Sequence, residues 1–238
     1  MQSHLYRIWN SLNAQTIGSD RHWQIALQDA SFHSDMLPLL KKYAEGEVLD
    51  LGAGRMSWRY LLPPSYFSAD ISIEHPDLDL LCDITRTLPF VAGSFQTIFC
   101  CSVLEHAREP WFSLEDMYRV LRGGGVTILS VPFTFYLHGQ PHDYWRFTRY
   151  GAVYLAEKAG FEVEEIVTNG GLFHLILNAP SILLSCFWAA LRLNGMIPIT
   201  TRILLSVAQF LERLFNTQNL FAMNHILLLR KHKEEKLS

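Results

Sequence analysis

The segment at residues 47–54, Glu-Val-Leu-Asp-Leu-Gly-Ala-Gly, constrains the fold more than any other part of the chain. Its apolar run, Val48 to Leu51, is interrupted only by Asp50 and is typical of a strand buried on both faces. Gly52 and Gly54 then let the backbone turn sharply and approach a ligand without a Cβ in the way. A buried parallel strand that runs into a glycine turn is the usual binding crevice of an open α/β sheet.

The residues of this turn favour one class of ligand. A dinucleotide site needs the pattern G-x-G-x-x-G, but Ser57 stands at the third glycine position. Met56 and Trp58 crowd the place of a diphosphate, and the Asp50 carboxylate repels phosphate but suits a cation. The turn therefore favours a ligand with an ammonium, a sulfonium and an adenosine group. The alternative is a tight strand-to-helix turn that binds nothing.

Composition and charge set limits on the class of protein. The 238 residues suit one α/β domain with an elaboration, and 49% hydrophobic residues are enough to bury a core. A net charge of −3 gives no basic footprint for nucleic acid. The four cysteines show neither a C-x-x-C pair nor zinc spacing, which indicates reduced thiols in a cytoplasmic protein.

Strand and helix patterns alternate along the chain, which predicts βαβ units and a parallel sheet. Residues 1–19 show little periodicity and are expected to form a flap or a loose arm. A helix is expected from Asp20, its N-cap, with Pro38 kinking or dividing it. A turn is expected at 122–125. The remaining expected elements are strands at 47–51, 66–70, 78–83, 95–101, 126–131, 161–167 and 225–230, and helices at 58–62, 111–121 and 148–159.

Two acidic residues end expected strands. Asp70 lies 20 residues beyond Asp50, the usual place for a carboxylate that binds ribose hydroxyls, although a loop aspartate that caps a turn is the alternative. Asp83 ends the third strand in the same way. The polar and aromatic loop at 132–148 follows a strand's carboxyl end, so it belongs at the same edge of the sheet.

An ordered series of motifs resembles the class I S-adenosylmethionine-dependent methyltransferases, in particular the branch with quinone-biosynthesis-type and saccharide-cluster enzymes. The resemblance covers about residues 45–170 and returns at the last strand. The motifs are Asp50-Leu51-Gly52-Ala53-Gly54, Ala69-Asp70-Ile71-Ser72, Cys82-Asp83, Leu88-Pro89-Phe90, Gly93-Ser94-Phe95, Val103-Leu104-Glu105-His106, Arg119-Val120-Leu121-Arg122-Gly123-Gly124, Ser130-Val131-Pro132, His142-Asp143-Tyr144-Trp145-Arg146-Phe147-Thr148 and Ala159-Gly160-Phe161. Two positions depart from the pattern: Arg55-Met56 stands where many members have another glycine, and Gln96 replaces a common aspartate.

The resemblance implies a Rossmann-like, seven-stranded, mostly parallel sheet whose last strand is antiparallel and inserted beside the fifth. It also implies S-adenosylmethionine as cofactor. Gly52 and Gly54 would approach its methionine part, Asp50 its amino group and Asp70 its ribose. Asp83 and Ile84 would face the adenine, and Ser102 the sulfonium. The full set of cofactor residues that the resemblance implies is Asp50, Gly52, Ala53, Gly54, Asp70, Ile71, Asp83, Ile84 and Ser102.

Acceptor chemistry is less specified by the sequence. If a hydroxyl accepts the methyl group, a base helps to remove its proton, and histidine suits that role near neutral pH. His106, His138 and His142 are the candidates, with Asp143 to orient one of them; a surface histidine without a role is the alternative for each. Gly139 and Pro141 prevent a helical metal pair between His138 and His142, so no metal site is expected. Candidate contacts for the acceptor are Tyr144, Trp145 and Arg146, although the two aromatic residues also suit packing.

Four segments are expected: an N-terminal arm and helix at 1–44, the methyltransferase domain at 45–171 plus 223–231, an apolar insertion at 172–222, and a charged tail at 232–238. The insertion reads as a helical hairpin with a first helix from Asn178 or Pro180 to Asn194 and an amphipathic second helix at 199–215. A single membrane span is disfavoured because the chain must return to the sheet. The hairpin is expected to cap the acceptor site, to form a homodimer or to attach shallowly to a membrane.

The sequence thus predicts a cytoplasmic enzyme, or one peripheral to the membrane, that methylates a hydroxyl of a saccharide, a glycolipid or a small metabolite. A quinone-type C-methyltransferase and a non-catalytic cofactor-binding subunit are the alternatives. A nicotinamide dehydrogenase is disfavoured by the missing third glycine and by Asp50.

Overall fold

The computed structural model describes residues 4–233 and divides into two compact units. The sheet unit comprises Leu37–Val167 and the chain from Asn224 onward; the helical unit comprises the chain up to Met36 and Thr168–Met223. Each unit has its own hydrophobic core, built around Leu49, Ile98 and Leu129 in the sheet unit and around Leu12, Ile25 and Ile197 in the helical unit.

A seven-stranded sheet forms the sheet unit in the order β3-β2-β1-β4-β5-β7-β6. β1 to β5 pair in parallel, and β7 runs antiparallel to β5 between β5 and β6. This topology confirms the expected sheet with an antiparallel last strand beside the fifth. The strands are β1 (Val48–Leu51), β2 (Phe67–Asp70), β3 (Leu80–Leu81), β4 (Phe95–Cys101), β5 (Leu121–Pro132), β6 (Glu162–Gly170) and β7 (Ala222–Arg230).

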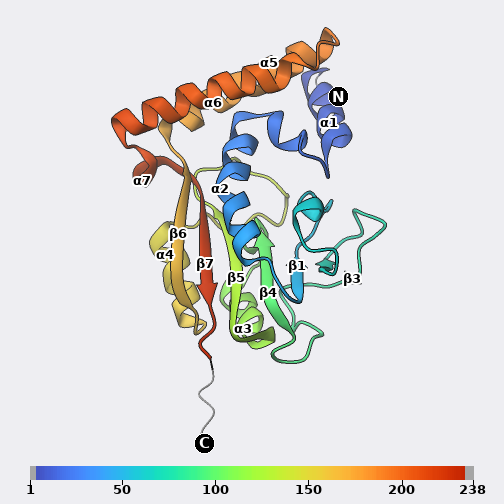
Figure 1. Cartoon of the computed structure of the whole chain (residues 1–238), viewed down its shortest axis with the longest axis vertical. Coiled ribbons are helices and arrows are strands. Elements are labelled where there is room, and N and C mark those ends of the chain that lie inside the picture. The colour runs from blue at the N-terminus through green and yellow to red at the C-terminus, as the bar shows by residue number, and fades with distance from the viewer. Residues whose placement is uncertain (1–3, 234–238) are drawn as a thin grey trace, which may run out of the picture. The chain divides into compact units, whose positions relative to one another are not determined.

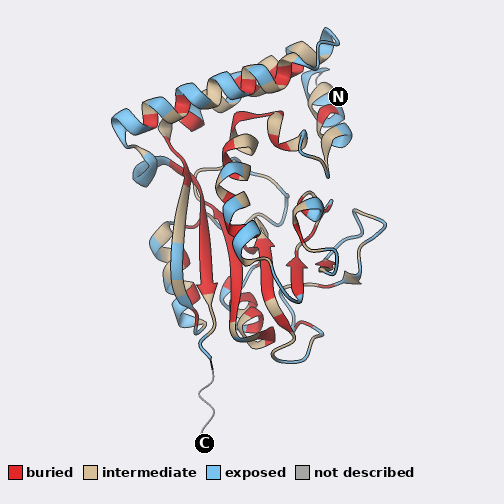
Figure 2. Cartoon of the chain, viewed as in Figure 1, coloured by how far each residue is buried: buried red, intermediate tan, exposed pale blue. Residues whose placement is uncertain are grey.

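The central strands are buried on both faces, as their apolar sequences predict (Figure 2). Helices α3 (Pro110–Val120) and α4 (Arg149–Lys158) pack together, and α3 buries Leu114 and Met117 in the core of the sheet unit. Thr148 caps α4 by accepting a hydrogen bond from the Gly151 N–H at its hydroxyl oxygen. Both helices thus contribute side chains to the core of the sheet unit.

The expected turn at 122–125 is wrong, because β5 begins at Leu121 and these residues extend the strand. Leu121 pairs with Phe95 and Val126 with Thr97, so the register shifts along the glycine run. A Cβ at Gly125 would lie 2.7 Å from the Gln96 carbonyl oxygen. The glycine therefore permits a close approach of two strands, and not a turn. The short helix expected at 58–62 is a single 3-10 turn, η2 (Arg59–Leu61).

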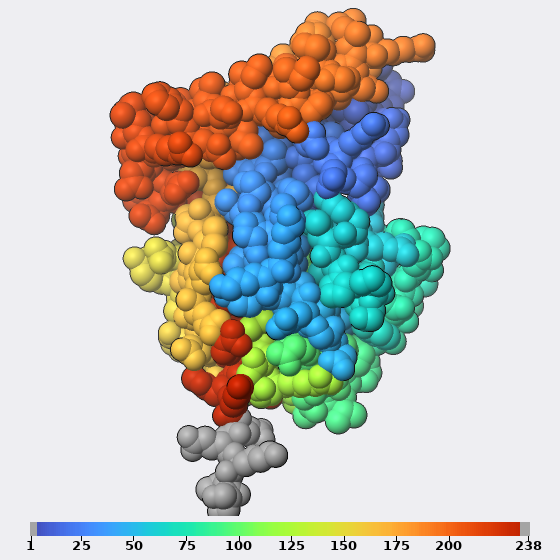
Figure 3. Space-filling view, viewed as in Figure 1, coloured from blue at the N-terminus to red at the C-terminus, as the bar shows by residue number. Residues whose placement is uncertain are grey.

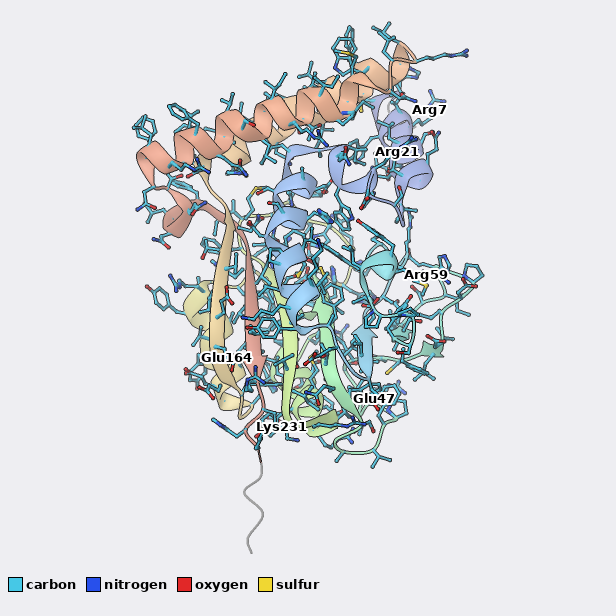
Figure 4. All side chains as sticks on the ribbon, in the orientation of Figure 1. Arg7, Arg21, Glu47, Arg59, Glu164 and Lys231 are labelled. Atoms are coloured by element: carbon cyan, nitrogen blue, oxygen red, sulfur yellow. The ribbon has the colours of Figure 1, made fainter. Side chains whose placement is uncertain are left out.

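At the amino edge of the sheet, charged side chains tie segments together. Arg122 pairs with Glu47, which immediately precedes β1. Lys231 follows β7, and its Nζ donates to the carbonyl oxygens of Tyr118 and Leu121. Glu47 and Lys231 are labelled in Figure 4. The charged side chains at the amino edge are thus used in structural contacts. Ligands of open α/β sheets bind at the opposite edge, where the carboxyl ends of the parallel strands lie.

The flap or loose arm expected at 1–19 is wrong, because residues His4–Thr16 form helix α1 of the helical unit. Leu12 packs with Ile25 and Ile197, and these long-range contacts supply the stability that the weak local periodicity did not indicate. The unit also contains η1 (His22–Gln24), the first turns of α2 (Leu27–Tyr43), α5 (Leu172–Ala190), α6 (Met196–Phe215) and α7 (Gln218–Phe221).

Two helix starts differ from the sequence prediction, for one reason. α2 begins at Leu27 and not at Asp20, because the Leu27 N–H donates to the Ser181 hydroxyl. α5 begins at Leu172 and not at 178–180, because the Phe173 N–H donates to the Glu212 carboxylate. Both caps come from residues far away in the sequence, so no local signal marks them. Pro38 and Pro180 lie inside their helices without dividing them.

The amphipathic helix α6 exposes its apolar face. Ile203 is 58% exposed and Phe210 is 66% exposed. Glu212, which the sequence pattern groups with the polar residues, is only 4% exposed. The hairpin also contains the single described helix that is long and apolar enough to cross a membrane, Leu172–Ala190, and one such helix is weak evidence for a span. Part of α6 is visible in orange to orange-red in Figure 3.

Candidate functional site

A cleft of about 990 Å³ opens at the carboxyl ends of β1, β2 and β4, entirely within the sheet unit. It lies where the turns after these strands meet, at the edge that the sequence indicated. Its lining consists of Gly52, Gly54, Asp70, Ile71, Ser72, Glu74, Asp83, Thr85, Ser102, Val103, His106, Arg108, Glu109, Gly139, His142 and Tyr144.

The glycine turn forms one wall. Gly52 has φ +83° and Gly54 φ +50°, in the left-handed region that side chains other than glycine rarely adopt. A Cβ at Gly52 would lie 2.2 Å from Val103 Cγ2, whereas a Cβ at Gly54 would meet no protein atom within 4 Å. Gly52 therefore permits close packing of two loops. Gly54 leaves open space beside the backbone, where a ligand can approach.

Two carboxylates lie beside neighbouring strands: Asp70 ends β2, and Asp83 follows β3, which is shorter than the expected strand at 78–83. Asp70 Oδ2 accepts a hydrogen bond from the Gly54 N–H at 2.9 Å, and its Oδ1 accepts one from the Ser72 N–H at 2.9 Å. Asp83 Oδ1 accepts from the backbone and hydroxyl of Thr85. The Ser72 hydroxyl also donates to Asp70 Oδ1 at 3.2 Å, so of the about four acceptor positions of a carboxylate one is left for a ligand hydroxyl. Ile71, between these acids and 70% exposed, provides an apolar surface for a base.

Asp50 is buried and is not among the lining residues of the cleft. It is 3% exposed, and burial followed by the nearby charge of Asp70 raises its pKa to about 7. Ala53 and Ile84 are also absent from the lining residues. The structure thus gathers Gly52, Gly54, Asp70, Ile71, Asp83 and Ser102 around the cleft. Contacts of the whole set with a cofactor stay a prediction.

Ser102 sits at the end of β4 with φ +54°, a strained conformation for a residue with a side chain. Its N–H lies 3.1 Å from the Ser130 hydroxyl oxygen and 3.2 Å from the Ser130 carbonyl oxygen. These contacts from the neighbouring strand β5 hold the turn in place. Backbone strain that its surroundings maintain is common at ligand sites.

The three candidate histidines occupy different positions. His106 and His142 line the cleft, whereas His138 is not among the lining residues. His106 Nδ1 lies 2.6 Å from the His142 carbonyl oxygen, and His142 Nδ1 lies 2.9 Å from the Tyr144 hydroxyl. The sequence proposed Asp143 as an orienting group. Its Oδ2 lies 3.5 Å from His138 Nδ1, although its main partner is Arg146, which holds the Asp143 pKa well below its usual range.

The 144–146 segment serves mainly to hold the loop. Tyr144 lines the cleft, and its hydroxyl accepts from Arg108 Nε at 3.0 Å. Trp145 donates from Nε1 to the Ala107 carbonyl, and Arg146 forms two hydrogen bonds with Asp143. Trp145 and Arg146 are not among the lining residues, so Tyr144 is the candidate acceptor contact that the structure places at the cleft.

Glu105 is a residue that sequence reasoning missed as a member of the site. It is completely buried, and its two carboxylate oxygens have no hydrogen-bond partner among residues 4–233. Oε1 lies 3.6 Å from His138 Nε2 and 4.0 Å from His106 Nε2. The proximity of Glu105 raises the pKa of His138. The sequence analysis used Val103-Leu104-Glu105-His106 only as a family motif, and an acid beside a histidine gives no local sign of burial.

Comparisons with known proteins bear on this site. Residues 64–129 match the model of a family described as a methyltransferase domain. This match identifies residues 64–129 as part of a methyltransferase domain, and the strand order of the sheet is the one that the resemblance to class I enzymes implies. S-adenosylmethionine is the cofactor of this domain. No curated protein matches the chain.

Solved structures share the methyltransferase fold at low sequence identity. A chain of the Haloferax volcanii complex between the Trm112 methyltransferase activator and a methyltransferase has 17% identity and a TM-score of 0.57, over 98% of this chain and 100% of that one. A S-adenosylmethionine-dependent methyltransferase from Archaeoglobus fulgidus has 15% identity and a TM-score of 0.55, over 84% and 91%. The [4+2]-cyclase SpnF has 15% identity and a TM-score of 0.57, over 87% and 82%. Such likenesses show the fold alone, and the cyclase illustrates that this fold hosts more than one chemistry.

The geometry of the methyltransferase cleft suits the cofactor. Four acids and one arginine line it among the described residues, and an excess of negative charge favours a ligand with a sulfonium and an ammonium group. The open space at Gly54 admits a ligand against the backbone, and Asp70 has an acceptor position for a ribose hydroxyl. These features do not suit a diphosphate.

Proposed function

We propose that the protein is a S-adenosylmethionine-dependent methyltransferase that methylates a hydroxyl of a saccharide, a glycolipid or a small metabolite. The observation that carries the proposal is the placement of histidines on the cleft wall shared with the glycine turn. His106 and His142 line the same cleft as Gly52 and Asp70. A cofactor-binding subunit without activity needs Gly52 and Asp70 to bind the cofactor. It has no use for histidines that can accept a proton next to them.

Each group of cleft residues has its own role in this proposal. The bound cofactor supplies an activated methyl group on a cationic sulfur. Gly54 and Asp70 hold the cofactor, and the strained turn at Ser102 fixes the adjoining wall. His106 or His142 receives the proton of the acceptor hydroxyl, since imidazole titrates near neutral pH. Tyr144, which contacts both His142 and Arg108, positions the acceptor.

The first expected result is micromolar binding of S-adenosylmethionine and S-adenosylhomocysteine, and no binding of NAD, in calorimetric titrations of the purified protein. Turnover is then measured as S-adenosylhomocysteine formation with panels of saccharide, glycolipid and quinone-like acceptors. Activity with a hydroxyl acceptor that falls about 100-fold in His142→Asn supports the base. Binding of NAD alone contradicts the methyltransferase proposal, and methylation of a ring carbon supports a quinone-type enzyme instead.

We also propose that residues 172–222 attach to a membrane surface rich in anionic lipids. Large apolar side chains are exposed along both helices, among them Phe187, Ile203 and Phe210. Figure 2 shows exposed positions along the length of the hairpin. The single acid in this segment, Glu212, is buried, whereas Arg192, Arg202 and Arg213 are exposed. An apolar face with exposed arginines matches an anionic lipid surface better than a second copy of itself, because the arginines of two copies would repel.

Cosedimentation with vesicles tests this attachment. The protein is expected to bind vesicles that contain phosphatidylglycerol and to bind pure phosphatidylcholine vesicles at least about 10-fold more weakly, since each arginine near the surface contributes about 1 kcal/mol. The double variant Phe210→Asp, Leu214→Asp is expected to lose binding. Val91→Asp, which replaces another exposed apolar residue in the sheet unit, is the matched control. A dimer in light scattering, with no vesicle binding, would assign the face to a second copy and overturn the membrane proposal.

A further inference from the structure

A buried carboxylate and two imidazoles converge beside the cleft. The ligand atoms of Glu105, His106 and His138 all lie within 4.8 Å of one another. His106 lines the cleft, and Glu105 lies behind it, fully buried. We propose that these three side chains bind one divalent first-row transition-metal ion, such as Zn²⁺, Mn²⁺ or Co²⁺.

The distances suit such an ion. Metal–ligand bonds to imidazole and carboxylate are about 2.0–2.2 Å, so two ligands of one ion lie about 3–4 Å apart. Glu105 Oε1 is 3.6 Å from His138 Nε2 and 4.0 Å from His106 Nε2. Both gaps are longer than a normal hydrogen bond, and all three ligand atoms lie within 4.8 Å of one another, so a small movement of the side chains would place an ion between them.

The imidazoles are held in the orientation that metal binding needs. His106 Nδ1 lies 2.6 Å from the His142 carbonyl oxygen, and His138 Nδ1 lies 3.2 Å from the Tyr136 carbonyl oxygen. A carbonyl oxygen only accepts, so each Nδ1 carries the hydrogen and each Nε2 faces Glu105. A ring that releases its Nε2 proton when the ion binds would direct the Nε2 lone pair at that ion. Histidines that bind metals commonly donate the other ring N–H to a carbonyl in this way.

A glycine fixes the position of the first imidazole. Gly139 has φ +62°, and a Cβ there would lie 2.6 Å from His106 Cε1. The loop that carries His138 thus packs directly on the ring of His106. Gly139 and His106 also face the cleft. The three protein ligands would therefore leave coordination positions open toward the cleft.

The unpartnered carboxylate is the independent observation. Burying an ionised carboxylate without hydrogen bonds is strongly unfavourable, and proteins usually pair such a group or use it to bind a metal. Glu105 has two buried oxygens without a hydrogen-bond partner in the described chain. A bound cation supplies the missing partner. The donor set of two imidazoles and one carboxylate suits zinc and other first-row ions better than Mg²⁺ or Ca²⁺.

The role of the ion rests on the proposed methyl transfer. An acceptor oxygen in an open coordination position would be held in the cleft, and its hydroxyl would lose its proton to His142 more readily. This places His106 and His138 as metal ligands and leaves His142 as the candidate base. It also replaces the sequence-based expectation of no metal site, which considered only His138 with His142.

Metal binding is measured on the chelator-treated full chain by calorimetry with Zn²⁺ and Mn²⁺, and with Co²⁺ by its visible d–d absorption. One ion per chain is expected. Glu105→Gln and His138→Asn are expected to weaken binding on the order of 100-fold or more, since loss of even an outer-shell partner costs 10–100-fold. The matched controls Glu109→Gln and His142→Asn, which change an acid and an imidazole of the same cleft, are expected to bind the ion as the wild type does.

S-adenosylhomocysteine affinity, measured in parallel, separates this inference from the proposed function. Loss of the ion in the two ligand variants with unchanged cofactor affinity supports the metal site, whether or not an acceptor is found. A wild type that binds no ion at one per chain, or ligand variants that bind it as tightly as the controls, overturns the metal site. Glu105 and His138 would then form an ion pair, and the methyltransferase proposal would stand unaffected.

Discussion

Asp70→Ala is expected to weaken the binding of S-adenosylhomocysteine about 100-fold. Hydrogen bonds to a charged group contribute about 1.5–3 kcal/mol each, and 2.7 kcal/mol corresponds to a factor of about 100. The carboxylate stands at the end of β2 on the cleft lining and accepts from the Gly54 N–H. The substitution therefore removes a ribose acceptor and also loosens the turn against which the cofactor lies. Calorimetric titration measures the change.

A second carboxylate bound to the same strand provides the control. Asp79 Oδ2 accepts from the Ser68 N–H at 2.8 Å and from the Ser68 hydroxyl at 2.7 Å, yet Asp79 does not line the cleft. Asp79→Ala thus removes comparable hydrogen bonds to β2, and its S-adenosylhomocysteine affinity is expected to stay within about 3-fold of the wild type. Equal losses in the two variants would mean that Asp70 acts only on the stability of the strand, and its ribose role would be wrong.

The sheet was readable from the sequence because its signals are local. An apolar run such as Val48–Leu51 has one environment in which it is stable, the interior of a sheet, and β4 was predicted with its observed bounds, Phe95–Cys101. The helix starts were not readable. Leu27 and Phe173 donate to Ser181 and Glu212, so the caps exist only after distant segments have met.

The candidate site also contains residues that local sequence signals identify and one residue that they do not. Gly52, Gly54 and Asp70 occupy fixed places in consecutive loops, and the fold brings them to one edge. Glu105 gave no comparable signal, since an acid next to a histidine on a loop usually faces solvent. Its significance comes from burial and from His138, which is 33 positions further along the chain. A functional group that conflicts with its local pattern is visible only in the structure.

Glu212→Ala is expected to destabilise the helical hairpin by about 4 kcal/mol. The Glu212 carboxylate accepts from the Phe173 N–H at the start of α5, from the Thr217 N–H and from the Thr217 hydroxyl, at 2.8, 3.3 and 2.5 Å. Removing it leaves these donors without an acceptor, and a charged hydrogen bond is worth about 1.5–3 kcal/mol. Burial lowers the pKa of the adjacent His174, so at neutral pH its ring is uncharged and does not compensate for the lost carboxylate.

Hydrogen exchange read by mass spectrometry localises the effect to one unit. Protection of peptides from α5 and α6 is expected to fall about 1,000-fold, the equivalent of 4 kcal/mol, whereas peptides from β4 and β5 keep theirs. Arg213→Ala, which changes the adjacent exposed residue on α6, is the matched control and is expected to have little effect.

Gly171 offers a second check, because a Cβ there would lie 2.2 Å from Glu212 Oε1. Gly171→Ala should therefore cost less stability in the Glu212→Ala background than in the wild type. Equal costs in both backgrounds, or unchanged protection in Glu212→Ala, would show that this carboxylate does not hold the base of the hairpin.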